Sequence, residues 1–78
     1  LDGEYEFLEG KIPEASELVN KSIKDANFPE DVRVGAIVRK DKVIMPKSNI
    51  VFDKDDILVL LSKREQLKEV ESFFRTTS

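Results

Sequence analysis

The sequence contains neither cysteine nor histidine. Disulfides, zinc sites built from thiolate or imidazole ligands, cysteine nucleophiles and histidine general bases are therefore excluded. The three glycines, Gly3, Gly10 and Gly35, are too far apart to form a loop that cradles phosphate. The serines have no histidine to activate them. We therefore expect that this chain is not an enzyme and holds no cofactor or metal.

Long hydrophobic runs are also missing. The longest covers residues 57–61, whereas a membrane-spanning helix needs about 20 apolar residues. Acidic residues outnumber basic ones by 16 to 13, which gives a formal net charge of −3. Such a balance argues against binding to nucleic acid or to anionic lipid, because both require clustered Lys and Arg. We expect no nucleic-acid partner and no direct membrane insertion.

The 78 residues correspond to one small domain, residues 1–78, with 40% hydrophobic and 37% charged residues. A domain of this size buries only about 60–65% of the surface that its unfolded chain exposes. Because disulfides and zinc are excluded, oligomerisation is the remaining source of additional stability. The first residue is Leu1, and we expect the domain to have been excised from a longer protein.

The first half of the chain predicts a strand and a short helix. Alternating residues between Glu4 and Ile12 predict the first strand, which ends before Pro13. Ser22 and Asp25 have the spacing of a capping box, so a helix of one or two turns is expected there.

The segment from Val32 to Arg39 shows the alternation of a strand. Strict alternation places Val32 and Val38 on one face, and Ile37 and Arg39 on the other. Lys40-Asp41 predicts a tight hairpin turn into a strand at residues 43–45.

The second half predicts a charged corner at residues 53–56, followed by a strand from Ile57 to Leu61 that is buried on both faces. Ser62 and Glu65 form a second capping box, and Leu67, Val70, Phe73 and Phe74 form the apolar stripe of a terminal helix of about three turns. The fold class is therefore α+β: a small, mostly antiparallel sheet with a short helix after the first strand and an amphipathic C-terminal helix.

Arg39 is the candidate binding residue, because its guanidinium at the end of a strand can bind phosphate or carboxylate in a bidentate manner. The alternative is an ion pair with Asp41 or Asp56. The carboxylates of the charged corner, at positions 53, 55 and 56, lack the order of a calcium loop and are interpreted as a solvated turn.

Phe73 and Phe74 are neighbours on a helix, so they cannot point inward along one line. Both are candidate core residues, with one of them available to cover a partner chain. Together with Ile37, they form the predicted dimer interface.

Several segments together resemble the C-terminal domain of RCK proteins, the TrkA-C domain, and most closely the version found in the TrkA subunit of bacterial potassium uptake systems. The segments that carry this resemblance are Val34-Gly35-Ala36-Ile37-Val38-Arg39, Val43-Ile44-Met45-Pro46, Asp56-Ile57-Leu58-Val59-Leu60-Leu61 and Val70-Glu71-Ser72-Phe73-Phe74. The chain departs from the family where Asn20 and Asp55 stand in place of Gly, and at Ser48-Asn49-Ile50. Asn and Asp tolerate the left-handed conformation, so these turns are expected to survive.

The resemblance implies a dimeric regulatory module that senses a ligand and controls a bacterial potassium transporter without catalysis. Its partners would be a second copy, a membrane-embedded transporter subunit and a cyclic dinucleotide or another small anion. The implied ligand residues are Arg39, Ile44 and Pro46. NAD(H) or an adenine nucleotide would bind a preceding domain. The implied location is the cytoplasm, at the inner face of the cell membrane.

Two alternatives remain open at the level of sequence. One is the cytoplasmic TrkA-C insert of another ion or anion transporter, which the flanking sequence would reveal. The other is a free-standing sensor of a small ligand, which would bind an anion tightly at Arg39 without a membrane partner.

Overall fold

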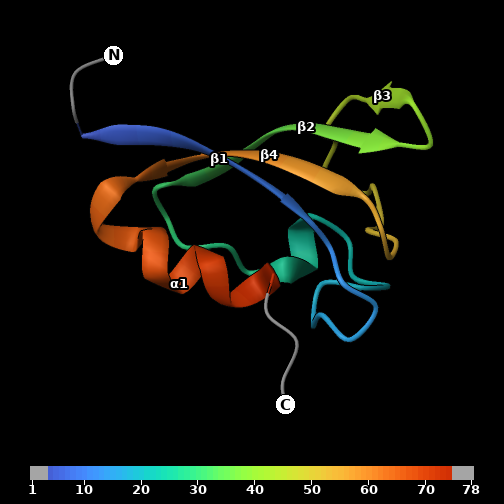
Figure 1. The fold of residues 1–78 in the computed structure, drawn as a ribbon, viewed down its shortest axis with the longest axis horizontal. Coiled ribbons are helices and arrows are strands. Elements are labelled where there is room, and N and C mark those ends of the chain that lie inside the picture. Colours follow the sequence, from blue (N-terminus) through green and yellow to red (C-terminus); the bar gives the residue numbers. More distant parts are fainter. Residues whose placement is uncertain (1–3, 75–78) are drawn as a thin grey trace.

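A computed structural model describes residues 4–74, which form one four-stranded antiparallel sheet. The strands are β1 (Tyr5–Lys11), β2 (Val32–Arg39), β3 (Lys42–Ile44) and β4 (Ile57–Lys63). Their order across the sheet is β1-β4-β2-β3, so β4 lies in the middle between the first strand and the hairpin. The predicted fold class, an antiparallel sheet combined with a C-terminal helix, is confirmed (Figure 1).

A helical layer covers one face of this sheet (Figure 1). It contains the 3₁₀ turn η1 (Lys24–Ala26) and a continuous C-terminal helical segment made of η2 (Arg64–Gln66), α1 (Leu67–Glu71) and η3 (Ser72–Phe74). The predicted capping box at its start is wrong. Ser62 still belongs to β4, is fully buried, and donates its hydroxyl proton to the carbonyl of Lys63 at 2.9 Å.

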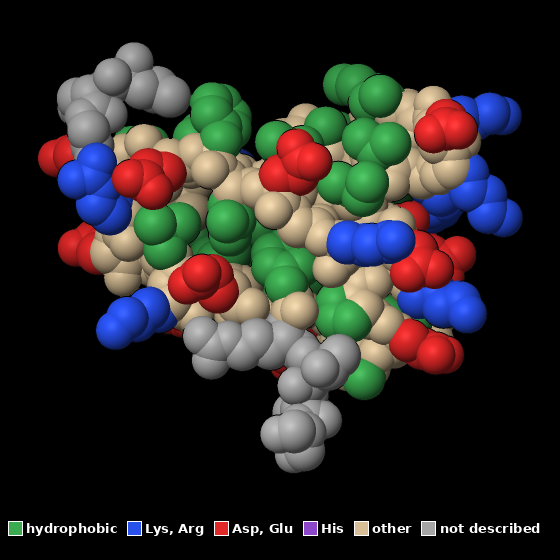
Figure 2. All heavy atoms as spheres, viewed as in Figure 1, with side chains coloured by type: hydrophobic (Ala, Val, Ile, Leu, Met, Phe, Trp, Pro, Cys, Tyr) green, Lys and Arg blue, Asp and Glu red, His purple; other side chains and the backbone are tan. Residues whose placement is uncertain are grey.

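The two faces of the sheet differ in burial. Leu58, Leu60 and Ser62 of β4 face the helical layer and are fully buried, whereas the alternate residues of that strand are only half-buried. The prediction that this strand is buried on both faces is therefore wrong, since no helix among residues 4–74 covers the second face. Figure 2 shows hydrophobic side chains projecting along the upper margin of the molecule, away from α1.

The core lies between the sheet and the helical layer. Its buried members are Ile12, Leu18, Ala26, Val32, Ile37, Phe52, Leu58, Leu60, Val70 and Phe73. The Phe28 ring packs edge-on against Phe52 and Phe73, with centroid distances of 6.0 and 5.1 Å. Ser16 ties the first loop to the end of the chain, because its buried hydroxyl donates to the Phe73 carbonyl at 2.6 Å.

An irregularity in β2 changes which residues face the core. The pairing of β2 with β4 shifts between Val34 and Ala36. Such a bulge inserts one residue and reverses the alternation beyond it. Ile37 consequently lies on the covered face with Val32, and Val38 lies on the open face, so the prediction of strict alternation is wrong for the second half of this strand.

Left-handed backbone occurs at several sharp corners. Asn20 and Asp55, which stand where the TrkA-C pattern has Gly, have φ angles of 71° and 68°, which confirms the expectation that these turns survive. The hairpin turn Lys40-Asp41 is also left-handed at both residues, with φ angles of 49° and 66°. The short helix is reduced to η1, but the Ser22 hydroxyl does accept the Asp25 amide proton at 3.1 Å.

The conformation of Asp55 leads to a stability prediction. A non-glycine residue in the left-handed region is strained, so Asp55→Gly should raise the free energy of unfolding by about 0.5–1 kcal/mol. Lys54→Gly is the matched control in the same turn, because Lys54 does not have a positive φ angle and gains only backbone entropy in the unfolded state. Urea denaturation measures both variants. Equal changes would contradict the role of the left-handed backbone.

Candidate functional site

The candidate site forms where the end of β2 meets the beginning of β4. The Arg39 Nε donates to Asp56 Oδ1 and its Nη2 donates to Asp56 Oδ2, each at 2.8 Å. Asp56 is 1% exposed and the Arg39 side chain is 32% exposed. The structure thus confirms the ion pair with Asp56 that the sequence offered as the alternative to a free guanidinium.

Two further hydrogen bonds fix this pair to the backbone. Arg39 Nη2 also donates to the Val51 carbonyl at 2.9 Å, and the Asp53 amide donates to Asp56 Oδ2 at 2.8 Å. The pair therefore joins two strands to the corner between them. The hydrogen bonds to Asp56 raise the pKa of Arg39 above its ordinary value, and the charges of Asp56 and Asp53 add to this, so the guanidinium stays charged.

The remaining guanidinium nitrogen, Nη1 of Arg39, makes no hydrogen bond within residues 4–74. Arg39 lines a cavity of about 430 Å³ at this end of the sheet. The cavity is also lined by Lys11, Val38, Lys40, Asp41, Asp53, Lys54, Asp55, Asp56 and Ile57. Asp56 neutralises the charge of Arg39. The other charged residues of the lining are lysines and aspartates in equal number.

The sequence did not predict that three lysines would line this cavity together. Lys11 ends β1, Lys40 lies in the hairpin turn, and Lys54 lies in the corner before β4. The antiparallel register places Lys11 opposite Ile57, directly after the corner that carries Lys54, and Lys40 follows the end of β2 on the other side of β4. No local motif indicates this convergence, since it depends on strand pairing between distant segments.

The other predicted ligand residues lie elsewhere in the single chain. Ile44 pairs with Ile37 across the β2–β3 hairpin and packs against the core. Pro46 follows β3 and is half-buried. Neither lines the cavity beside Arg39. A role for Ile44 and Pro46 in ligand binding stays a prediction.

The residues of the predicted dimer interface are used inside the chain. Ile37 is 0% exposed and Phe73 is 8% exposed, both within the core. Phe74 is half-buried and packs against β1, so closely that a Cβ atom at Gly10 would lie 3.0 Å from its ring. The side chain of Ile37 has no exposed surface to offer a second chain. An interface role for these residues remains a prediction.

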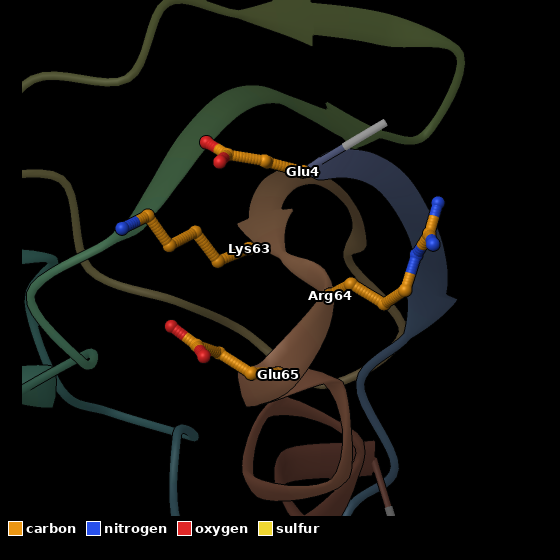
Figure 3. A pocket seen from close by; sticks show the side chains of 4 residues that line it. All are labelled: Glu4, Lys63, Arg64 and Glu65. Atoms are coloured by element: carbon orange, nitrogen blue, oxygen red, sulfur yellow. The ribbon is translucent and has the colours of Figure 1, made fainter. Parts of the chain in front are cut away.

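A second cavity, of about 410 Å³, lies at the opposite end of β4 and is lined by Glu4, Lys63, Arg64 and Glu65 (Figure 3). Three of these side chains extend to the same side, whereas Arg64 points away toward β1, where its Nε donates to Glu6 at 3.1 Å. Lys63 lies 3.6 Å from Asp31, and the charge of that carboxylate raises the pKa of Lys63. With two carboxylates around one already paired ammonium, this cavity is the poorer candidate for an anion.

Neither a metal centre nor a membrane-spanning helix is found within residues 4–74. No group of three carboxylates there is arranged to hold a metal ion, and Asp56, one member of the charged corner, is already occupied by Arg39. No helix in this part of the chain is long and apolar enough to cross a membrane.

The buried ion pair leads to a second stability prediction. Asp56→Asn removes the charge that compensates Arg39 and should lower the free energy of unfolding by about 2–4 kcal/mol, somewhat less than for a fully buried pair because Arg39 reaches solvent. Asp53→Asn is the control, since the exposed Asp53 side chain hydrogen-bonds to the neighbouring Lys54 amide and acts on Arg39 only through its charge, without an ion pair. Urea denaturation should show a change below about 0.5 kcal/mol for the control. A loss for Asp56→Asn as small as that of the control would contradict the structural role of the pair.

Sequence comparisons place the chain in a known family. The TrkA-C domain model matches residues 7–75. The Trk system potassium uptake protein TrkA of Azorhizobium caulinodans is 34% identical over 77 residues, which are 99% of this chain but 17% of that protein. A TrkA homolog of Archaeoglobus fulgidus is 33% identical over 58 residues, which are 74% of this chain and 13% of the homolog. The chain thus spans less than a fifth of these relatives.

Solved structures share the fold. The RCK C domain of the potassium transport protein KtrA, in complex with cyclic di-AMP, matches with a TM-score of 0.74 and 27% identity, covering 87% of this chain and 81% of that one. The RCK_C domain dimer of S. agalactiae BusR, also in complex with cyclic di-AMP, matches with a TM-score of 0.74 and 22% identity over 87% of this chain and 93% of that one. With a family match along nearly its whole length and the same sheet and helix, this chain belongs to the TrkA-C domain family.

Proposed function

We propose that this chain is the regulatory, ligand-sensing and dimerisation module of a bacterial potassium uptake system, and that its ligand is cyclic di-AMP. The names of its relatives support the potassium uptake system, and the complex of the KtrA domain with cyclic di-AMP supports the ligand. The controlled transporter would be a separate membrane-embedded subunit. An NAD(H)-binding or adenine-nucleotide-binding domain would lie in the part of the longer relatives that this chain does not span.

One observation carries the ligand part of this proposal. Arg39 is held at its Nε and Nη2 atoms by the buried Asp56, and its Nη1 atom is left without a protein partner within the described residues, beside a cavity. A guanidinium fixed in this way loses little side-chain entropy when it binds, and a charge-assisted hydrogen bond to a phosphate oxygen is among the stronger polar contacts.

The lining of the cavity suits a ligand with both anionic groups and hydrogen-bond donors. Its lysines can bind phosphate, and its remaining carboxylates can accept hydrogen bonds from an amino group. Cyclic di-AMP carries two phosphodiesters and two adenine amino groups. A purely anionic ligand such as inorganic phosphate would meet as many carboxylates as lysines and should bind more weakly.

Regulation without catalysis follows from the residues available. Without histidine or cysteine, the chain lacks the usual general base and thiol nucleophile, so binding is the activity that its side chains support. A ligand that binds one arrangement of the dimer more tightly shifts the population toward that arrangement. In the proposed system, this shift would act on a membrane-embedded transporter subunit from the cytoplasmic side.

The binding role of Arg39 can be tested by calorimetric titration of the 78-residue chain with cyclic di-AMP. Arg39→Lys keeps the positive charge but removes the fork that both holds Asp56 and reaches the ligand, so affinity should fall at least tenfold, which corresponds to about 1.4 kcal/mol. Arg33→Lys is the matched control on the same strand, since Arg33 donates only to the nearby carbonyls of Glu30 and Val32.

Binding by the control should remain within about twofold of the unsubstituted chain, and circular dichroism should confirm that both variants are folded. Unchanged affinity of Arg39→Lys would overturn the role of Arg39. A wild-type chain that does not bind cyclic di-AMP would overturn the ligand itself.

A further inference from the structure

The outer edge of β1 is unpaired within residues 4–74. β1 is the first strand in the order β1-β4-β2-β3, so only its inner edge has a neighbour. Its seven residues pair one for one with those of β4, without the register shift that interrupts the pairing of β2. β1 contains no proline, and its one lysine, Lys11, is its last residue. A long and regular edge strand of this kind is a template for pairing with another strand.

Hydrogen bonds at the two ends of β1 indicate which of its backbone groups face outward. The Ile12 amide donates to the Asp56 carbonyl at 2.8 Å, and the Arg64 amide donates to the Glu4 carbonyl at 2.9 Å. Backbone groups of an antiparallel strand point alternately to its two sides, so the even-numbered residues of β1 bond to β4. The odd-numbered residues point their amides and carbonyls to the free edge, where no described residue bonds to them. These residues are Tyr5, Phe7, Glu9 and Lys11.

A groove of about 270 Å³ lies beside this edge, between β1 and the C-terminal helical segment. It is lined by Leu8, Glu9, Gly10, Glu71 and Phe74. Leu8 and the Phe74 ring, which lies against Gly10, form its apolar part. Glu9 and Glu71 are exposed, and neither makes an ion pair within residues 4–74. The groove therefore combines an apolar surface with two uncompensated carboxylates.

We propose that the edge of β1 and this groove bind an extended, basic segment of a partner protein, which joins the sheet as a fifth strand. Main-chain hydrogen bonds to the outward amides and carbonyls supply affinity, as in other complexes formed by strand addition. A residue of the added strand opposite Gly10 directs its side chain toward the groove. An arginine at that position stacks on Phe74 and pairs with Glu71. This inference goes beyond the proposed function and does not depend on it.

Charge favours this occupant over a second copy of the chain. A second β1 strand would bring two glutamates and one lysine to an edge that already carries Glu9 and adjoins Glu71. Like charges on neighbouring strands are destabilising. A segment with arginine at the groove position instead compensates the carboxylates.

Amide hydrogen exchange of the 78-residue chain, measured by NMR, tests the added strand. The probe is an acetylated and amidated peptide, Thr-Val-Thr-Arg-Thr-Val-Thr, which places its arginine and both valines on one face of a strand. At saturation, the peptide should slow exchange of the outward amides of Phe7 and Glu9 by about tenfold, because they lack a partner in the free chain. The amides of Leu8 and Gly10 serve as the internal reference, since β4 already protects them. A peptide with glutamate in place of arginine should give no such protection.

Charge variants, compared by calorimetric titration with the same peptide, test the groove. Glu71→Lys should raise the dissociation constant of the arginine peptide by about tenfold. Glu69→Lys is the matched control, because it makes the same charge change at an exposed position of α1 outside the groove. The control should stay within about twofold of the unsubstituted chain.

A proline variant tests the backbone edge. Glu9→Pro removes one outward amide without removing a hydrogen bond to β4, which an edge strand tolerates, and it should abolish binding. Glu9→Gln removes the same charge but keeps the amide, and it should still bind. Circular dichroism verifies that every variant is folded. If Glu9→Pro does not fold, the exchange of the outward amides in the unsubstituted chain decides the question.

Four results would overturn the proposal. The first is a lack of protection of the outward amides at peptide concentrations up to about 1 mM. The second is equal binding of the arginine and glutamate peptides, and the third is an equal effect of Glu71→Lys and Glu69→Lys. The fourth is protection of the outward amides that rises with the concentration of the chain alone, which would make a second copy the occupant.

Discussion

The ion pair between Arg39 and Asp56 organises the end of the molecule that holds the candidate site. A buried carboxylate is costly unless its oxygens are satisfied, and here both oxygens accept hydrogen bonds, from the Arg39 guanidinium and the Asp53 amide. The same guanidinium also binds the Val51 carbonyl. One side-chain pair therefore holds together the end of β2, the segment before the corner, and the beginning of β4. Both strands that it joins, β2 and β4, are interior strands of the sheet.

In the proposed function, this constraint gives the ligand a binding group that is already oriented. Asp56 binds two of the three guanidinium nitrogens and thereby orients the third, Nη1, which is the donor proposed to meet the ligand. The lysines that share the cavity come from the end of β1, the hairpin turn and the corner, and their positions depend on the same strand pairing.

Much of the fold was predictable from the sequence because local rules and tertiary packing agree there. The alternation before Arg39, the polar turn at Lys40-Asp41 and the stripe around Val70 specify the hairpin and the terminal helix. Three features were not predictable. The bulge between Val34 and Ala36 reverses the alternation. An isolated glycine such as Gly35 only suggests a bulge, and the face on which Ile37 lies is set by the pairing with β4, so Ile37 was assigned to an interface although it belongs to the core. Ser62 has the spacing of a cap, yet pairing with β1 and β2 keeps it in β4. The sequence of β4 alone does not show whether a helix covers its second face, because that depends on how the rest of the chain packs against the sheet.

The candidate site was predictable only in part, for a related reason. Arg39 and its possible partner Asp56 were found because each flanks a strongly patterned strand. The lysines of the cavity come from three separate segments, and the strand register that brings them together is set by long-range pairing. Whether Ile44 and Pro46 contribute depends on the assembled protein, since neither lines the cavity in the single chain.

The central claim is that Asp56 holds Arg39 while its Nη1 atom meets the ligand. Nitrogen-15 NMR of the arginine side chains during a titration with cyclic di-AMP tests it most directly. The account predicts that the Arg39 Nε proton exchanges slowly with water in the free chain, compared with that of the exposed Arg33, and stays protected on binding while the Nη1 protons shift. An Arg39 guanidinium as mobile as that of Arg33, or one whose Nε proton loses its protection when the ligand binds, would contradict the account.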